Sequence, residues 1–174
     1  MYYIAQGFGF LGLLAMVIAL FQKNKSKMLF FVIFNCIFFS LEYLFLGAFA
    51  GMGSNVVALG RTYLFKKKDE DERFNTIWIY IIVMVLYTII GIFTYNGLIS
   101  LMPIVAEYIY ATALWQKNID HIRYGTAIMV VIWLIYDIIV QAYPSAMCDT
   151  IVLISTLISI IKSKVESSRG GVIF

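Results

Sequence analysis

Six apolar stretches of about 20 residues, almost without charged side chains, restrict this chain more than any other feature. They lie at residues 3–21, 28–46, 76–94, 97–115, 124–142 and 146–162. A helix needs about 20 apolar residues to cross the hydrocarbon core of a bilayer. Hydrophobic residues make up 62% of the chain and charged residues 13%, against about 45–50% and about 25% in soluble domains. The sequence therefore predicts an all-α integral membrane protein.

A weaker stretch, residues 50–65, contains three glycines and Arg61, yet the basic residues make it a seventh span. With residues 50–65 counted as the third span in chain order, lysines and arginines follow spans 1, 3, 5 and 7. Of the 13 basic residues, 12 therefore fall on one side of the membrane. An excess of Lys and Arg marks the cytoplasmic side. We therefore expect the N-terminus outside and the C-terminus in the cytoplasm. The run KKKDEDER at 66–73 is interpreted as a solvated cytoplasmic loop, with a regulatory patch as the alternative.

An internal repeat organises these spans. LFQKN at 20–24 recurs as LWQKN at 114–118, and the same spacing of 94 residues pairs Asn55 with Asp149. A spacing of 95 pairs Glu42 with Asp137. Repeats of this kind are common in transporters, whose substrate sites lie at the repeat interface. The pattern predicts two parallel three-helix repeats joined by one linker helix, a 3+1+3 arrangement.

The predicted boundaries follow from this repeat. The first triple-helix repeat covers residues 1–66, and the cytoplasmic loop and linker helix cover 67–95. The second triple-helix repeat covers 96–163, and residues 164–174 are expected to form a flexible cytoplasmic tail.

Two charged residues are expected near the middle of the membrane. Arg61 and Glu107 each lie about 10 residues from the outer end of their spans, or about 15 Å at 1.5 Å per residue. A charged side chain at the bilayer centre costs about 2.5–3.5 kcal/mol, so it is retained for a reason. We predict an ion pair between Arg61 and Glu107 across the two repeats. The alternative is a pair that only locks the bundle, without contacting a ligand.

Four further polar residues are candidates for binding a substrate or coupling ion. Glu42 and Asp137 lie near the outer ends of their spans, with Trp133 one turn from Asp137, and they are predicted to line an outward cavity. The alternative is that these acids extend toward the outer surface. Asn55 and Asp149 are the other two candidates, although both residue types are also preferred helix N-caps.

Pro103 lies four residues before Glu107 and frees a backbone carbonyl, so it is a candidate hinge or ligand contact, or else a simple kink.

One histidine and two cysteines give neither a metal site nor a disulfide framework. Nucleotide-binding, zinc-protease and serine-hydrolase motifs are not found in the sequence. We therefore expect a protein that is not an enzyme, has no cofactor and binds no nucleic acid.

Several segments together resemble the bacterial inner-membrane YgjV family over about residues 3–163. They are AQGFG (5–9), LGAFAGMGSNVVALGRTYLF (46–65), LMPIV (101–105) and WLIYD (133–137). The resemblance implies an inner-membrane location. The layout is also similar to the PQ-loop, SWEET and PnuC group of 3+1+3 transporters, which implies transport by analogy.

Within the family pattern, the resemblance marks Gln6, Arg61, Pro103 and Trp133 as characteristic residues. This chain departs from the pattern twice. Glu42 stands where the family would have His, and Asp137 stands where it would have Asn. Both departures add an acid, which allows a different ligand within the family.

Transport of a small solute is the leading functional hypothesis. The two triplets would rock about a midplane site that binds a small polar or cationic solute, with protons as a further candidate, and the lipid bilayer would be the surrounding partner. The alternative is a membrane receptor or partner-binding subunit that does not transport. A cavity that reaches the buried charges would favour transport, and a solid apolar interior would favour the alternative. The sequence leaves oligomerisation open.

Overall fold

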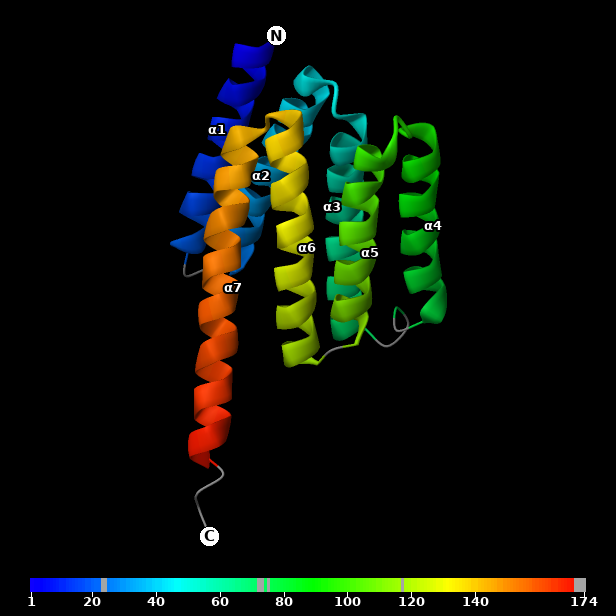
Figure 1. Ribbon diagram of the computed structural model, residues 1–174. Coiled ribbons are helices and arrows are strands. Elements are labelled where there is room, and N and C mark those ends of the chain that lie inside the picture. The colour runs from blue at the N-terminus through cyan, green and yellow to red at the C-terminus, as the bar shows by residue number, and fades with distance from the viewer. Residues whose placement is uncertain (23–24, 72–73, 75, 117, 171–174) are drawn as a thin grey trace.

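The computed structural model describes residues 1–22, 25–71, 74, 76–116 and 118–170 of the chain (Figure 1). These residues form helices and no strands. The elements are α1 (Tyr2–Leu20), α2 (Lys25–Leu46), α3 (Phe49–Glu70), α4 (Ile77–Phe93), the short 3-10 helix η2 (Leu98–Leu101), α5 (Met102–Trp115), α6 (Ile119–Val140) and α7 (Tyr143–Gly170). The predicted all-helical class is confirmed.

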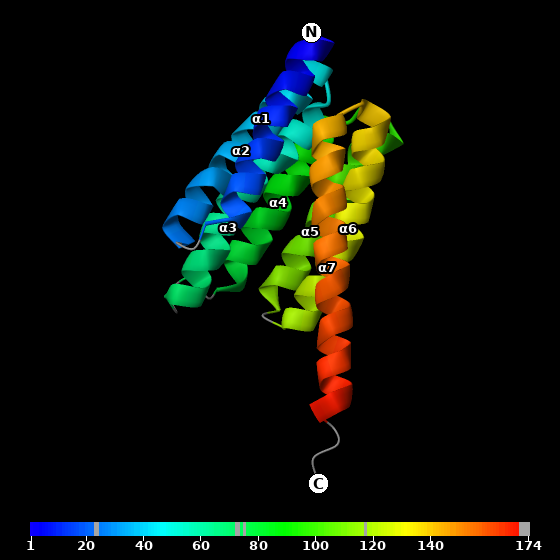
Figure 2. The same cartoon turned by 90° about the vertical axis from the view of Figure 1, so that its left-hand side faces the viewer.

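Successive helices run in alternating directions, and the two ends of the chain lie at opposite ends of the bundle (Figures 1 and 2). The helix α7 has 28 residues, which corresponds to about 42 Å, and it extends past its neighbours (Figure 1). Residues 164–170, expected in a flexible tail, continue this helix. Residues 171–174 of that expected tail lie outside the described part of the chain.

Six of the helices form a ring, in the order α1, α2, α3, α5, α6, α7 and back to α1. Each helix of the ring packs against the two beside it in this order. The helix α4 stands outside the ring and packs against α3 and α5 (Figure 1). Exchanging α1, α2 and α3 for α5, α6 and α7 leaves the order of the ring unchanged.

Length and composition identify four of the described helices as able to cross a membrane: Tyr2–Ala19, Leu98–Trp115, Ile119–Val140 and Tyr143–Val165. Phe30–Leu46 and Ile77–Phe93 are shorter apolar helices. The segment predicted as the weak third span lies in α3, which is not among these helices.

Local backbone geometry recurs at a spacing of 94 residues. Gly47 follows α2 with a φ of 72°, and Gln141 follows α6 with a φ of 63°. After each of them, the amide of the next residue donates to the carbonyl five residues earlier, at 2.8 Å in both places. The next helices then begin at Phe49 and Tyr143, again 94 residues apart. A residue in the left-handed conformation ends a helix and reverses the chain direction. The two turns therefore have the same backbone geometry.

This spacing corrects one predicted equivalence. At 94 residues, Asp137 corresponds to Tyr43, and Glu42 corresponds to Tyr136. The spacing of 95 that paired Glu42 with Asp137 is wrong, because it shifts the helices by one residue relative to the hydrogen bonds at their ends.

Two further expectations change at the helix ends. Pro103 is the second residue of α5, after η2, and lies in its first turn. A proline there removes no helical hydrogen bond, so the alternative of a simple kink within the helix is wrong, and the hinge stays a prediction. Lys68, expected in a solvated loop, is 5% exposed. Its Nζ donates to the carbonyl oxygen of Trp115 at 2.7 Å and lies 3.8 Å from the centre of that indole.

Candidate functional site

The predicted ion pair between Arg61 of α3 and Glu107 of α5 is confirmed, and it lies in the interior of the bundle. Nη1 of Arg61 contacts Oε2 of Glu107, and the two residues are 4% and 5% exposed. Tyr87 of α4 connects them, because its hydroxyl accepts from Nη1 of Arg61 at 3.2 Å and donates to Oε2 of Glu107 at 3.0 Å. A buried charge needs a partner and hydrogen bonds, and this group supplies both.

Aromatic side chains complete the surroundings of the ion pair. Nε1 of Trp133 on α6 donates to the second carboxylate oxygen of Glu107 at 3.2 Å. The ring of Tyr110 lies 4.8 Å from Cζ of Arg61. An aromatic face attracts a guanidinium ion at this separation. The Nε group of Arg61 has no hydrogen-bond partner among the described residues.

A cavity of about 380 Å³ reaches this group from within the ring. All six helices of the ring contribute to its wall, whereas α4 does not. Its polar lining consists of Asn35, Cys36, Asn55, Arg61, Thr62, Glu107, Ser145, Cys148 and Asp149, together with the tyrosine hydroxyls and the indole of Trp133. The volume is in the range of small-molecule sites.

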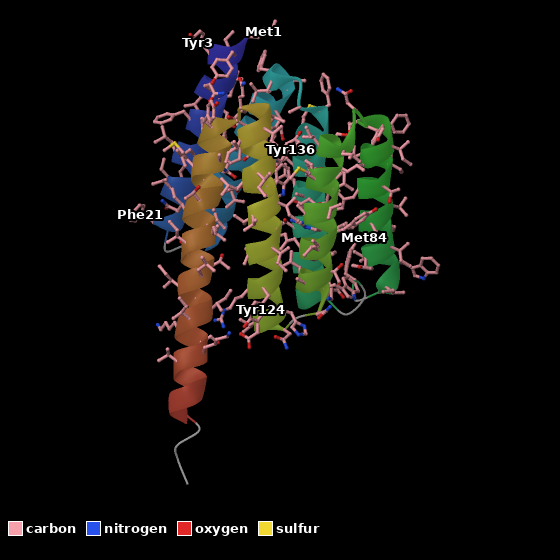
Figure 3. All side chains as sticks on the ribbon, viewed as in Figure 1. Met1, Tyr3, Phe21, Met84, Tyr124 and Tyr136 are labelled. Carbon is pink, nitrogen blue, oxygen red and sulfur yellow. The ribbon has the colours of Figure 1, made fainter. Side chains whose placement is uncertain are left out.

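A second cavity of about 280 Å³ adjoins the first along α7, because both are lined by Met16, Cys148 and Val152. It lies between α1, α6 and α7 and extends to Arg123 and Ser159. Arg123 is next to Tyr124, which Figure 3 places at the end of the bundle away from the N-terminus. The second cavity therefore extends toward that end of the bundle.

Asn55 and Asp149 both line the first cavity, and the alternative interpretation as helix N-caps is wrong. Each lies six residues after the first residue of its helix, because α3 begins at Phe49 and α7 at Tyr143. Asn55 donates to the carbonyl of Gly51 at 3.4 Å. The carboxylate of Asp149 makes no hydrogen bond or ion pair with a described residue.

Glu42 and Asp137 do not line the cavity, and they do not extend to the surface either, because both are 0% exposed. Ser145 donates to Oε2 of Glu42 at 2.5 Å, and Tyr43 donates to Oδ1 of Asp137 at 2.7 Å. The other carboxylate oxygen of each acid has no hydrogen-bond partner among the described residues. Ser145 and Tyr43, which donate to the two acids, line this cavity instead.

Four hydrogen bonds join the two triplets near the N-terminal end of the bundle. Two are those of Glu42 and Asp137. In the third, the hydroxyl of Tyr136 accepts from the amide of Gly51 at 3.2 Å, and Figure 3 shows Tyr136 within the bundle. In the fourth, the side chain of Gln6 donates to the carbonyl of Gln141 at 2.6 Å. These bonds close this end between α2, α3, α6 and α7, and between α1 and the turn that joins α6 to α7.

Sequence reasoning missed the tyrosines of this site. Tyr43, Tyr87, Tyr110 and Tyr136 are four of 12 tyrosines in the chain, and composition does not distinguish buried tyrosines from those at a membrane interface. For Tyr43 alone a signal was present, because it lies 94 residues before Asp137. No group of three or more His, Cys, Asp or Glu side chains in the described part of the chain could hold a metal ion.

The outer surface completes the description. Large apolar side chains are exposed on all sides, among them Tyr3, Ile92 and Phe93 at 87%, 70% and 84%. Figure 3 shows Tyr3 and Phe21 projecting away from α1. A soluble monomer rarely exposes large contiguous apolar patches. An apolar exterior around an interior that holds an ion pair defines an integral membrane protein with several apolar helices.

Comparison with known proteins agrees with this class. The model of the Imp-YgjV family, described as a bacterial inner membrane protein, matches residues 3–167. The chain belongs to this family, as its sequence motifs indicated. No protein with a curated description and no solved structure matches the chain.

Proposed function

We propose that this protein is a small-solute transporter of the bacterial inner membrane that works by alternating access. All seven helices cross the bilayer in this proposal, as two parallel triplets, α1–α3 and α5–α7, with α4 as the linker. The N-terminus is outside and the C-terminus is cytoplasmic. The solute binds between the triplets, in the cavity that Arg61 and Glu107 line.

The cavity beside a buried ion pair is the observation that carries this proposal. A receptor or partner-binding subunit with a solid interior has no need for it. Charged groups inside a membrane protein are costly and usually mark a functional path. The wall is shared by both triplets, and transporters built from repeats place the site at such an interface.

The ring order and the recurring turns support the parallel repeat. A half-turn about an axis along the bundle exchanges the two triplets and preserves every packing neighbour in the ring. The cross-triplet hydrogen bonds follow the same rule. Glu42 bonds Ser145, and the positions 94 residues away from these two, Tyr136 and Gly51, also bond each other.

The hydrogen bonds also suggest which state this is. The N-terminal end is closed by the four cross-triplet bonds, whereas the second cavity extends toward the opposite end. With the N-terminus outside, this state faces the cytoplasm. Opening the outer end then requires the triplets to separate at Tyr43–Asp137 and Glu42–Ser145.

Access to Cys36 tests the proposal without knowledge of the substrate. Cys36 and Cys148 are the two cysteines of the chain, and both line the cavity. In the Cys148→Ser variant, a membrane-impermeant maleimide should label Cys36 in right-side-out vesicles and in inside-out vesicles alike. Labelling from one face only, or only after denaturation, would contradict alternating access. The variant lacking both cysteines controls for background labelling.

A further inference from the structure

The charges in the wall of the 380 Å³ cavity do not balance. Its charged lining residues are Arg61, Glu107 and Asp149. Arg61 and Glu107 pair with each other, which leaves the carboxylate of Asp149 without a partner among the described residues. The wall therefore holds one acid, Asp149, that no cation of the described lining residues balances. A carboxylate in this position favours a positively charged group of the solute.

Beside the neutral polar side chains already named, most of the wall is aromatic and apolar. Phe39, Tyr43, Tyr110 and Trp133 present rings to the cavity. The rings of Tyr43 and Trp133 lie 5.7 Å apart, and the ring of Tyr110 already lies 4.8 Å from the guanidinium carbon of Arg61. Aromatic faces attract organic cations, most strongly where water is excluded. A strongly hydrated inorganic ion would lose its water without regaining it from such walls.

We infer that this cavity binds a protonated organic amine with a compact apolar or aromatic body. The ammonium group lies at the carboxylate of Asp149, and the body lies among Trp133, Tyr110 and Phe39. The inference rests on the proposed function, because it names the solute class of the same cavity.

Three compounds that share an aromatic body but differ in charge test whether the cavity prefers a cation. Phenethylamine, 2-phenylethanol and phenylacetate have a benzene ring on a two-carbon chain and are cationic, neutral and anionic at pH 7. The purified full chain in lipid nanodiscs is titrated with each, and binding is followed by calorimetry and by the unfolding temperature, since a ligand of the native state raises stability. We expect phenethylamine to bind at least 10-fold more tightly than the other two.

Asp149→Asn removes the charge and keeps the shape, and Asn is already the residue at the corresponding position 55. We expect this variant to lose at least 10-fold in affinity for phenethylamine while its affinity for 2-phenylethanol changes little. Asp120→Asn is the matched control, because Asp120 is an exposed acid paired with Arg123 outside this cavity. If Asp149→Asn melts early without ligand, Asp149→Glu takes its place and should keep the preference for the amine.

Equal binding of the three compounds, or an undiminished amine affinity in Asp149→Asn, would overturn the inference. Its failure is distinct from that of the proposed function. If the amine binds but Cys36 is not labelled from both sides, the proposed transport is refuted and the proposed amine site stands. If Cys36 is labelled from both sides but the amine is not preferred, the proposed transport stands and the amine site is refuted.

Discussion

Tyr43 and Asp137 occupy corresponding positions in the two triplets, 94 residues apart, and the hydroxyl of Tyr43 donates a 2.7 Å hydrogen bond to the carboxylate of Asp137. In the parallel repeat that we propose, two corresponding residues can touch only where the axis that exchanges the triplets passes between them. This contact therefore lies at the centre of the bundle, between α2 and α6. On either side of it, the hydrogen bonds Glu42–Ser145 and Gly51–Tyr136 occupy corresponding places.

We predict that Tyr43→Phe destabilises the protein more than Tyr136→Phe does. The first change removes the one hydrogen bond of the fully buried Asp137 carboxylate, whose Oδ2 is already unpartnered, and orphaning such a group costs about 1–3 kcal/mol. The second change removes a 3.2 Å bond to the amide of Gly51, worth about 0.5–1.5 kcal/mol.

Equilibrium unfolding in mixed micelles measures both changes. Together with the single variant Asp137→Leu, which cannot accept a hydrogen bond, the double variant Tyr43→Phe with Asp137→Leu provides the coupling energy, which averages about 0.6 kcal/mol for hydrogen bonds in membrane proteins and reaches about 1.7. A coupling energy of zero would show that the two residues do not bond each other.

The two left-handed turns allow a reciprocal exchange of residues. Gln141 has a φ of 63°, and the corresponding residue is Gly47, with a φ of 72°. A residue with a Cβ costs about 1–2 kcal/mol in this conformation. We therefore expect Gln141→Gly to raise the free energy of unfolding and Gly47→Gln to lower it, each by about 1 kcal/mol. Changes of the same sign in both variants would contradict the shared turn geometry.

Two glycines of α1 should respond in opposite ways to alanine. A Cβ at Gly9 would overlap the carboxyl group of Glu42, whereas a Cβ at Gly7 would have no atom within 4 Å. Overpacking of this kind costs about 1–3 kcal/mol, and Glu42 is completely buried. Gly7→Ala should be neutral or stabilise the helix by up to about 1 kcal/mol. Thermal unfolding of both variants in the same detergent measures the difference.

The contribution of the ion pair to stability can be measured separately from its contribution to transport. Arg61→Ala leaves the Glu107 carboxylate buried and unpaired, so we expect a loss of about 3–5 kcal/mol in stability. In the double variant Arg61→Met with Glu107→Met, stability should largely return, because apolar residues of similar volume can replace a buried pair. If Arg61 serves transport, the double variant should still insert and fold, but two-sided labelling of Cys36 should be lost. Unchanged labelling would mean that the pair only locks the bundle.

The sequence predicted the Arg61–Glu107 pair because depth in a membrane can be counted. Both residues lie about 10 positions from the same side, and each position adds about 1.5 Å. Counting gives no helix face, however, because these helices are apolar on most sides. In this state neither Glu42 nor Asp137 lines the cavity, so their place in an outward cavity stays a prediction, although both lie within the apolar segments as expected.

Helix starts explain one misplacement. Asp149 resembled a cap because its span was expected to begin at 146, whereas α7 begins at Tyr143. The start of α3 at Phe49 differs from the expected 50 by one residue, so Asn55 resembled a cap by its residue type alone. Pro144 is the second residue of α7, where proline is well tolerated, but in the sequence it reads as an interruption. The role of Tyr87 had no signal at all, because it depends on α4 packing beside α3 and α5.

The ion pair has no counterpart in the other half of the ring. The positions corresponding to Arg61 and Glu107 are Ser155 and Leu13, and Tyr87 comes from the linker, which occurs once. The backbone thus repeats while the charges do not. A bound molecule rotated by half a revolution would meet different partners, so it has one preferred pose, and the two mirror-image forms of a chiral solute should be held unequally.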